Sequence, residues 1–239
     1  MNHTSQISSY YEYTIPITQL IERYSQLYSG AIYDVLDEMG YPHQVLAVDI
    51  KPIRADMVLS GPAFTIKGVP DPVGDETLLK RRIHLFNDMR ALGCSLIDVR
   101  DCSFDLQAAH YGEMNAVVGR ASGVIGAVID GGCRDTGFLL KANFPVCCRY
   151  QTPVEAFRRW SYFNWQVPVG LRGALSSVVI VNPGDFVFGD LDGVLIIPRS
   201  IVIDVLEKAE KVVSVEDQAR QEFATTDDPI AVYQKYGKL

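Results

Sequence analysis

The sequence predicts a mixed α/β fold in a single compact domain, with helical arms at its two ends. Short apolar runs of strand length alternate with segments of helical periodicity along the whole chain, which favours a sheet covered by helices. Hydrophobic residues make up 48% of the 239 residues and charged residues 21%, as is typical of a globular protein with a real core. No repeat or linker-like stretch divides the chain, so residues 1–239 are expected to form one domain.

The elements follow from periodicity and from the residues that interrupt it. Residues 1–14 are expected to form a loose arm and residues 200–239 a helical arm, with Ser200 as the N-cap of the last helix. Helical spacing predicts the remaining helices at 18–28, 30–39, 75–92, 112–122 and 134–142. Apolar runs predict strands at 46–53, 57–67, 94–99, 126–130, 145–150, 177–181, 186–188 and 194–197.

Charge and cysteine content exclude several classes of protein. The net charge of −7 argues against a nucleic-acid-binding surface, which needs basic residues, but permits a small anionic substrate. Five cysteines without a CxxC pair favour reduced thiols over a disulfide framework. The N-terminus is polar and no apolar run approaches the roughly 20 residues of a membrane span. We therefore expect a cytoplasmic protein with no membrane or nucleic-acid partner.

The most informative stretch runs from Gly126 to Asp135. It is predicted to form an apolar strand and then a turn at Gly131-Gly132, followed by Arg134 and Asp135 at the start of a helix. Ends of strands followed by helix N-termini are where open α/β folds bind ligands. An arginine there can hold a carboxylate with two parallel hydrogen bonds, and an aspartate can bind a hard divalent cation. The pattern predicts a site for a small anion together with a metal ion.

A second candidate site is Gly112-Glu113-Met114-Asn115. A glycine that opens a helix leaves free backbone N–H groups beside the positive end of the helix dipole, where an oxyanion is stabilised. Glu113 could position or deprotonate a water there. A purely structural interpretation, in which Gly112 turns the chain and Glu113 favours the first helical turn, also fits this motif taken alone.

Three other patterns are weaker. Asp190 and Asp192 before Gly193 fit a hairpin turn better than a calcium loop, because the rest of an EF-hand is missing. Residues 150–165 mix aromatic side chains with arginines, which is typical of pocket walls and of interfaces, and a subunit contact is favoured over a lid. The histidines lack zinc-hydrolase spacing, and His110 is expected to be a packed or surface residue.

These motifs together resemble the RraA-like family, which includes metal-dependent 4-hydroxy-4-methyl-2-oxoglutarate/4-carboxy-4-hydroxy-2-oxoadipate aldolases and ribonuclease regulators. The resemblance covers most of the chain. The matching segments are 29–37, 61–65, 112–114, 130–135, 183–185 and 189–194.

The resemblance implies a fold like the swivelling phosphohistidine domain and a homotrimer, or a hexamer of two trimers, with sites at subunit boundaries. It implies that Arg134 binds the pyruvate carboxylate and that Asp135 holds Mg²⁺ or Mn²⁺, largely with waters. It also implies that the backbone after Gly112, at Met114 and Asn115, contacts the oxo-acid, and that Glu113 positions water. A glutamate near the C-terminus reaches the neighbour's site in the family, and Glu216 is the candidate for it here.

From these motifs and the resemblance we expect a class II lyase that cleaves a short 4-hydroxy-2-oxo-dicarboxylic acid to pyruvate and also decarboxylates oxaloacetate. Two other functions stay open. One is a non-catalytic regulator that docks onto a partner enzyme, and the other is a lyase on a sugar acid, in which Arg158 or Arg159 would hold a second carboxylate. Phe138 stands where aldolases of the family usually have an acidic residue, which favours the regulator. Gly112, Arg134 and Asp135 favour an enzyme.

Overall fold

The computed structural model describes residues 9–74 and 77–237, and a nine-stranded sheet forms the centre of this part of the chain. The strands of this sheet run in the order β1-β6-β5-β3-β2-β10-β11, with β4 beside β5 and β7 beside β2, and β8 and β9 form a separate pair. The strands are β1 (Lys51–Pro52), β2 (Leu59–Pro70), β3 (Leu96–Asp101), β4 (Ala109–Tyr111), β5 (Val124–Cys133), β6 (Val146–Gln151), β7 (Trp160–Trp165), β8 (Val169–Leu171), β9 (Val179–Val181), β10 (Phe186–Asp190) and β11 (Gly193–Ile197).

Parallel strands make up the middle of the sheet. The pairs β2–β3, β3–β5, β5–β6 and β4–β5 are parallel, and helices connect them. Strands of this kind are buried on both faces, which explains why their sequences are continuous apolar runs. The helices are η1 (Ser9–Tyr11), α2 (Ile17–Tyr24), α3 (Ser29–Glu38), α4 (Leu78–Leu92), α5 (Glu113–Ala121), α6 (Thr136–Lys141), η2 (Arg199–Ile201), α7 (Val202–Phe223) and α8 (Pro229–Tyr236).

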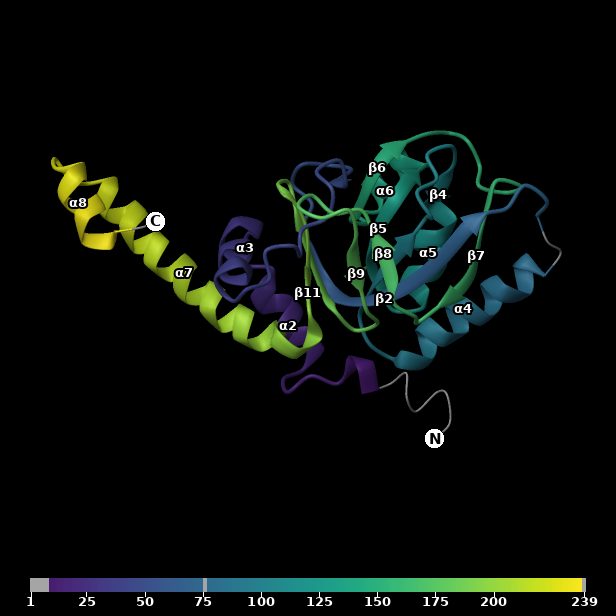
Figure 1. The fold of residues 1–239 in the computed structure, drawn as a ribbon, viewed down its shortest axis with the longest axis horizontal. Coiled ribbons are helices and arrows are strands. Elements are labelled where there is room, and N and C mark those ends of the chain that lie inside the picture. The colour runs from purple at the N-terminus through teal and green to yellow at the C-terminus, as the bar shows by residue number, and fades with distance from the viewer. Residues whose placement is uncertain (1–8, 75–76, 238–239) are drawn as a thin grey trace.

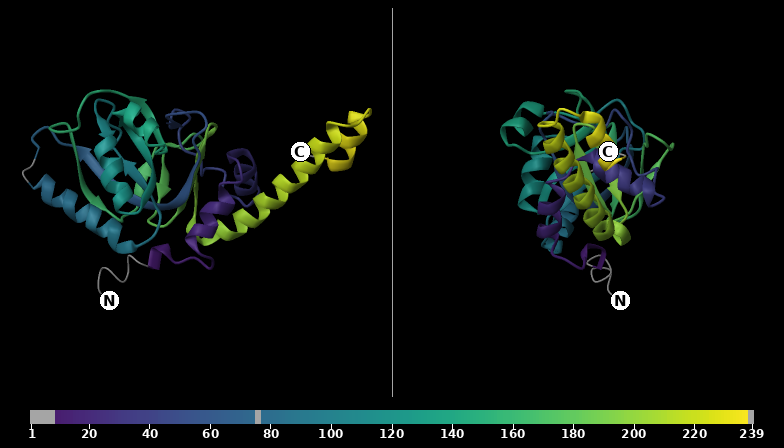
Figure 2. Two further views of the ribbon diagram at one scale, coloured as in Figure 1. Left: turned by 180° about the vertical axis from the view of Figure 1, so that it is seen from behind. Right: turned by 90° about the vertical axis from the view of Figure 1, so that its left-hand side faces the viewer.

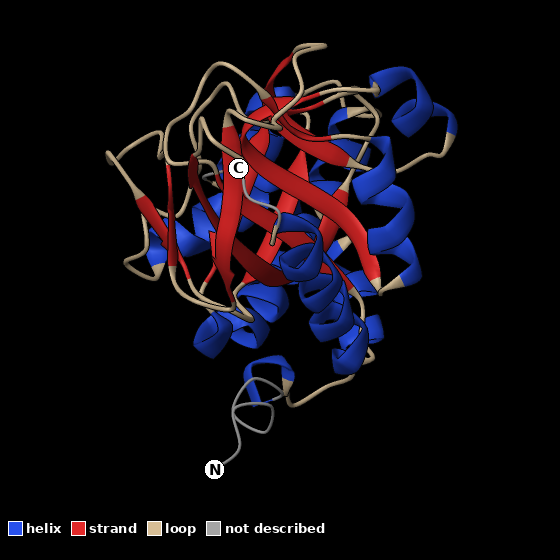
Figure 3. Ribbon diagram, turned by 90° about the vertical axis from the view of Figure 1, so that its right-hand side faces the viewer, coloured by secondary structure: helices blue, strands red, loops and turns tan. Residues whose placement is uncertain are grey.

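The long strand β2 joins the parallel centre to antiparallel strands. Its first residues pair with β10, its middle with β3 and its last residues with β7. The turn between β10 and β11 is the hairpin predicted at Asp192-Gly193. Helices flank the strands on the outside, as Figure 3 shows. The mixed α/β fold class predicted from the sequence is confirmed.

The C-terminal helices form the predicted helical arm. The start of α7 packs against α3 and the sheet through the buried side chains of Val205, Leu206 and Ala209. The helix continues along α3 as far as Glu216 and Arg220, which contact Tyr28. Its end then projects from the body of the molecule, and α8 folds back along its tip (Figures 1 and 2). There Lys235 forms an ion pair with Glu222.

The N-terminal arm is not loose where the structure describes it. Residues 1–8 of the predicted arm lie outside the described residues. Tyr11 is buried, and its hydroxyl donates to the carbonyl of Ala63 and contacts the amide of Gln166. Tyr13 donates to the carbonyl of Gly184. These aromatic side chains bind the segment to the sheet because their burial outweighs the entropy of a free arm.

Two local predictions were wrong. The strand expected at 46–53 is reduced to β1, because a turn closes between Ala47 and Ile50 and leaves Val48 exposed to solvent. Ser200 is not an N-cap: a 3-10 turn precedes α7, and no side chain caps that helix. Within residues 9–74 and 77–237, no helix is both long and apolar enough to cross a membrane.

Candidate functional site

A cavity of about 300 Å³ lies where β4 and β5 end. These adjacent parallel strands are followed directly by α5 and α6, so two helix N-termini meet at the same edge of the sheet. Residues at the end of β4, at the start of α5 and between β5 and α6 line one side of the cavity. Residues of α4, of β7 and of the loop before β7 line the other side, the second wall. The cavity therefore lies at the edge where α/β folds bind ligands.

Gly112 lets the two helix N-termini approach each other. Its backbone is extended (φ −163°), so no unusual conformation requires a glycine. A Cβ at this position would lie 2.7 Å from Asp135 Oδ2 and 3.0 Å from Arg134 Cγ. The next residue, Glu113, donates its backbone N–H to Asp135 Oδ2 at 3.3 Å. The glycine is thus needed for space, and the aspartate is held by the backbone of α5.

Asp135 has a left-handed backbone conformation (φ 57°, ψ 27°). Few residues other than glycine adopt it, and aspartate is one that tolerates it. It occupies the N-cap position of α6, yet its carboxylate does not cap that helix and points to α5 instead. This conformation turns the carboxylate of Asp135 toward the N-terminus of α5 at the cavity.

Arg134 lies on the same rim with part of its guanidinium free. Its backbone N–H donates to the carbonyl of Tyr111 at 2.9 Å, which fastens the end of β5 to β4. The side chain is 36% exposed, with Nε 3.4 Å from Asp135 Oδ2 and Nη2 3.9 Å from Glu155 Oε1. Both contacts are long for charge-assisted hydrogen bonds, so the guanidinium can still bind an anion.

Gly131 and Gly132 do not form the predicted turn, because strand β5 continues through them to Cys133. Their role is again space. A Cβ on Gly131 would lie 2.3 Å from His110 Nδ1, and one on Gly132 would lie 2.5 Å from Tyr150 Cε2. The backbone N–H of Gly132 donates to His110 Nδ1 at 3.0 Å. The two glycines let β4 and its histidine pack closely against β5.

His110 is a packed residue, as expected from the sequence. Since Nδ1 accepts from Gly132, Nε2 carries the proton and donates to Asp105 Oδ2 at 2.9 Å. Burial lowers the pKa of His110 to about 4, while Asp105 opposes this shift. The imidazole is therefore neutral at pH 7 and both nitrogens are used, so His110 positions β4 and is not a general base.

The other predicted site residues are divided between this cavity and neighbouring grooves. Met114 and Asn115 line the cavity. Glu113 contributes its backbone, but its side chain lines an adjoining apolar groove between α5 and α6 together with Phe138. Neither Arg158 nor Arg159 lines the cavity.

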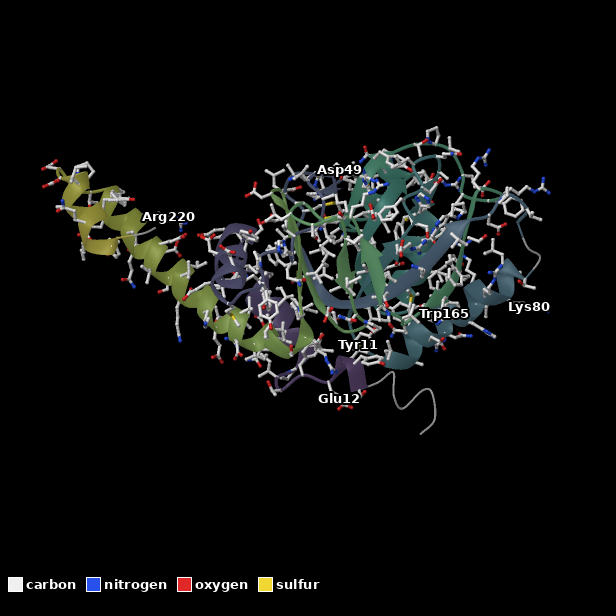
Figure 4. All side chains as sticks on the ribbon, viewed as in Figure 1. Tyr11, Glu12, Asp49, Lys80, Trp165 and Arg220 are labelled. Atoms are coloured by element: carbon white, nitrogen blue, oxygen red, sulfur yellow. The ribbon has the colours of Figure 1, made fainter. Side chains whose placement is uncertain are left out.

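Glu216 lies on α7 in a groove against α3, where it contacts the hydroxyl of Tyr28 and forms an ion pair with Arg220 at 2.6 Å. Figure 4 shows Arg220 on the projecting helix, well away from the cavity edge of the sheet. In one copy of the chain Glu216 therefore does not meet Arg134. Its predicted role in a neighbouring subunit's site stays a prediction.

Sequence reasoning missed residues of the second wall. Arg82 on α4 and the β7 residues Trp160 and Tyr162 line the cavity. Trp160 and Tyr162 lie on β7, which pairs with β2, and the mixture of aromatic residues and arginines at 150–165 was the available signal for a pocket wall. The subunit contact favoured for this segment stays a prediction. Arg82 carries no comparable signal, because it is one of several basic residues on α4.

Similarity to known proteins identifies the family of the chain. A family model described as "RraA-like: Aldolase/RraA" matches residues 29–196, which include Gly112, Arg134 and Asp135. The chain belongs to the RraA-like family. The match ends before α7, so it does not include Glu216.

Several relatives of this RraA-like chain cover nearly all of it. A protein of Halalkalibacterium halodurans named "Putative 4-hydroxy-4-methyl-2-oxoglutarate aldolase" is 29% identical over 212 residues, which are 89% of this chain and 91% of that protein. A solved structure described as "novel cellulases from microbes associated with the gut ecosystem" aligns with a TM-score of 0.78 at 31% identity, covering 91% of this chain and 96% of the other. Streptomyces coelicolor RraAS2, described as an unusual member of the RNase ES inhibitor RraA family, shares the fold with a TM-score of 0.71 at 21% identity, covering 87% and 99%.

The donors at the RraA-like site fit a magnesium or manganese ion held mainly by water. Within the described residues no group of three His, Cys, Asp or Glu side chains could enclose a metal ion. Mg²⁺ does not require such a cage, since it commonly binds one or two carboxylates and keeps several waters. The 38% exposed carboxylate of Asp135 offers Oδ1, which has no hydrogen-bond partner among the described residues.

Proposed function

We propose that the protein is a divalent-metal-dependent class II aldolase that cleaves a short 4-hydroxy-2-oxo-dicarboxylic acid to pyruvate, and that the same site decarboxylates oxaloacetate. The observation that carries this proposal is the convergence of Arg134, Asp135 and the N-terminus of α5 on one cavity. The aldolase name of the H. halodurans relative supports the same reaction class.

Arg134 would bind and orient the carboxylate of the oxo-acid. Its guanidinium is planar and partly exposed, so it can present two N–H groups to the two carboxylate oxygens. At the start of α5 the backbone N–H of Met114 has no hydrogen-bond partner among the described residues and can donate to an oxygen on which negative charge develops. The two groups together fix the pyruvate end of the substrate.

Asp135 would hold the Mg²⁺ or Mn²⁺ ion, which when bound supplies Lewis-acid stabilisation of the enolate formed as the C–C bond breaks. The contact from the Glu113 amide orients the carboxylate before metal binds. The side chain of Glu113 is partly exposed beside the cavity and would position the water that carries the proton.

The test is pyruvate release from a panel of 2-oxo-acids with Mg²⁺, with Mn²⁺ and after treatment with EDTA. We expect activity with metal and its loss in EDTA, and Asp135→Ala should lose the response to added metal. Asp192→Ala is the matched control, because Asp192 lies in the exposed hairpin turn away from the cavity. Full turnover of Asp135→Ala, or of the metal-free protein, would contradict the class II mechanism.

A non-catalytic regulatory function has one specific observation in its favour. Phe138, the aromatic residue in place of the usual acid, is 56% exposed in the groove between α5 and α6, beside the exposed Val117. The same assay decides between the two functions. A folded protein that releases no pyruvate from any acid with either metal would favour the regulator.

A further inference from the structure

Three residues that line the cavity each have a buried side-chain polar atom with no hydrogen-bond partner within the protein. These atoms are Tyr111 Oη, Trp160 Nε1 and Tyr162 Oη. Their residues are only 1%, 3% and 6% exposed, respectively. A buried polar group that pairs with nothing is costly, and such groups are few in folded proteins. Their three residues surround one cavity of about 300 Å³, so a ligand in this cavity that has hydrogen-bonding atoms is a candidate partner for them.

Trp160 is fixed in place and defines the chemistry of that ligand. Its ring occupies the space above Gly68, where a Cβ would lie 1.8 Å from Cζ2, and its centroid is 4.9 Å from that of His110 in an edge contact. The ring cannot turn away without disturbing β2 or β4. An indole N–H is a donor only, so its partner must be an acceptor.

Arg82 adds a positive charge to the same wall. Its Nη2 donates to Asn115 Oδ1 at 3.2 Å, and among the described residues no carboxylate lies within 4 Å of its guanidinium. Arg100, which also lines the cavity, differs, because both oxygens of Asp98 and the carbonyl of His110 accept its hydrogen bonds. The charge of Arg100 is neutralised within the fold, whereas that of Arg82 is available to a ligand.

We propose that Arg82, Trp160 and Tyr162 form a second recognition site within the cavity, the aromatic subsite, which binds the substrate carboxylate that Arg134 does not hold. A carboxylate is the group that best satisfies a guanidinium, an indole N–H and a phenol O–H together, since it is anionic and accepts several hydrogen bonds. A hydroxyl group would accept these hydrogen bonds without neutralising the charge of Arg82.

This inference rests on the proposed function in one respect, the placing of the oxo-acid end at Arg134. It goes further by assigning specificity for a dicarboxylic acid to residues of α4 and β7. Arg158 and Arg159, the sequence-based candidates for a second carboxylate, lie outside the cavity.

The experiment compares two ligands by isothermal titration calorimetry on the full-length protein in Mg²⁺. 2-Oxoglutarate has a distal carboxylate, and 2-oxopentanoate has the same five-carbon chain with a methyl group there. We expect 2-oxoglutarate to bind at least tenfold more tightly, the usual effect of a charge-assisted hydrogen bond. Tyr162→Phe and Arg82→Gln should reduce this ratio severalfold, because the loss of affinity should be larger for 2-oxoglutarate than for 2-oxopentanoate.

Arg90→Gln is the matched control, because it removes an exposed arginine from the same helix α4, and the ratio should not change. Tyr162→Phe keeps the ring and removes an unpaired hydroxyl, so a purely structural role predicts no loss of affinity. Equal affinity of the wild-type protein for the two acids, or an equal loss for both acids in the variants, would overturn the proposal. Ligand discrimination without pyruvate release would instead refute the lyase function and leave the subsite standing.

Discussion

At the scale of single residues, the site is assembled by backbone contacts. Arg134 is fastened through its N–H to Tyr111, and Asp135 is held in a left-handed conformation while its carboxylate accepts from Glu113. The two side chains also form an ion pair, with Arg134 Nε 3.4 Å from Asp135 Oδ2. A side-chain substitution at either position that preserves these backbone contacts should reduce catalytic activity while leaving the protein folded.

Arg134→Lys should impair activity even though the charge is kept. An ammonium group offers a point charge where the guanidinium offers a planar pair of donors. The loss of one of the two charge-assisted hydrogen bonds to the substrate carboxylate should cost on the order of 1.5–3 kcal/mol, or roughly ten- to a hundredfold in kcat/KM. The loss should be similar for every oxo-acid in the panel, because Arg134 is assigned to their common end.

Steady-state kinetics on a panel of mono- and dicarboxylic oxo-acids measure this effect, with circular dichroism as the check on folding. If Arg134→Lys reordered the substrates, or left kcat/KM untouched in a folded protein, the orientation of the substrate would be wrong.

Much of the first wall of the site could be predicted from the sequence, and the second wall could not. Gly112, Arg134 and Asp135 carry a local signal, because a glycine and charged residues follow directly after apolar runs. Arg82 and Tyr162 come from segments distant in the chain: the pairing of β7 with β2 places Tyr162 at the cavity, and helix α4 places Arg82 there. Local periodicity contains no information about such pairing.

At the scale of elements, β5 connects the site to the far side of the sheet. While Gly131 and Gly132 face His110 and Tyr150, Asp130 accepts a hydrogen bond from the backbone N–H of Arg172, just after β8, at 2.9 Å. The second oxygen of Asp130 lies 3.7 Å from Arg149 Nη1 and has no hydrogen-bond partner. The sequence predicted a turn at Gly131 and Gly132, because glycines commonly form turns. The side chains of His110 and Tyr150 that pack against these glycines come from other parts of the chain, so the sequence does not show the contact.

Asp130 should make the stability of the protein depend on pH. Burial raises the pKa of Asp130 to about 7, and Arg149 opposes this shift. The folded state then binds more protons than the unfolded state between pH 4 and 7, so this contribution to stability is present at low pH and is lost as pH rises to 7. Between pH 5 and 8 the loss should be on the order of 2–3 kcal/mol.

Urea denaturation of the wild type and of Asp130→Asn at several pH values tests this linkage. The asparagine variant, which cannot ionise but can still accept from Arg172, should show a flatter dependence between pH 5 and 8. Identical pH dependence in both proteins would show that Asp130 does not titrate in this range.

At the scale of the whole molecule, the projecting arm is the feature that one chain does not explain. Helix α7 packs along α3 as far as Glu216 and Arg220, which contact Tyr28, and its course places Glu216 away from the cavity. The end of α7 then projects from the body (Figure 1). Val215 on α7 and Ile230 and Tyr233 on α8 are 44%, 65% and 58% exposed. Apolar side chains on an extended arm are typical of a surface that contacts another subunit.

We therefore expect the protein to be a trimer or a multiple of three, as the family resemblance implies, with Glu216 completing a neighbour's site. Light scattering after size exclusion measures the assembly. Arg134→Ala and Glu216→Gln homo-oligomers should each be impaired, and mixing the two unfolded proteins and refolding them together should recover part of the activity, because some sites then contain both wild-type residues.

A stable monomer, or no recovery in the mixture, would remove the shared-site argument and the role of Glu216. Glu207→Gln, on the same helix and outside the groove that contains Glu216, is the control for a general effect on α7.

The packing of Trp160 over Gly68 also makes the protein its own optical reporter. The chain has two tryptophans, and the other, Trp165, lies at the end of β7 with its indole N–H bonded to Asp88. In a Trp165→Phe protein all indole emission would arise from the cavity wall. The emission maximum of an indole depends on the polarity around its N–H, so binding of an acid in the cavity should shift this maximum. The affinities of different ligands could then be ranked without any turnover.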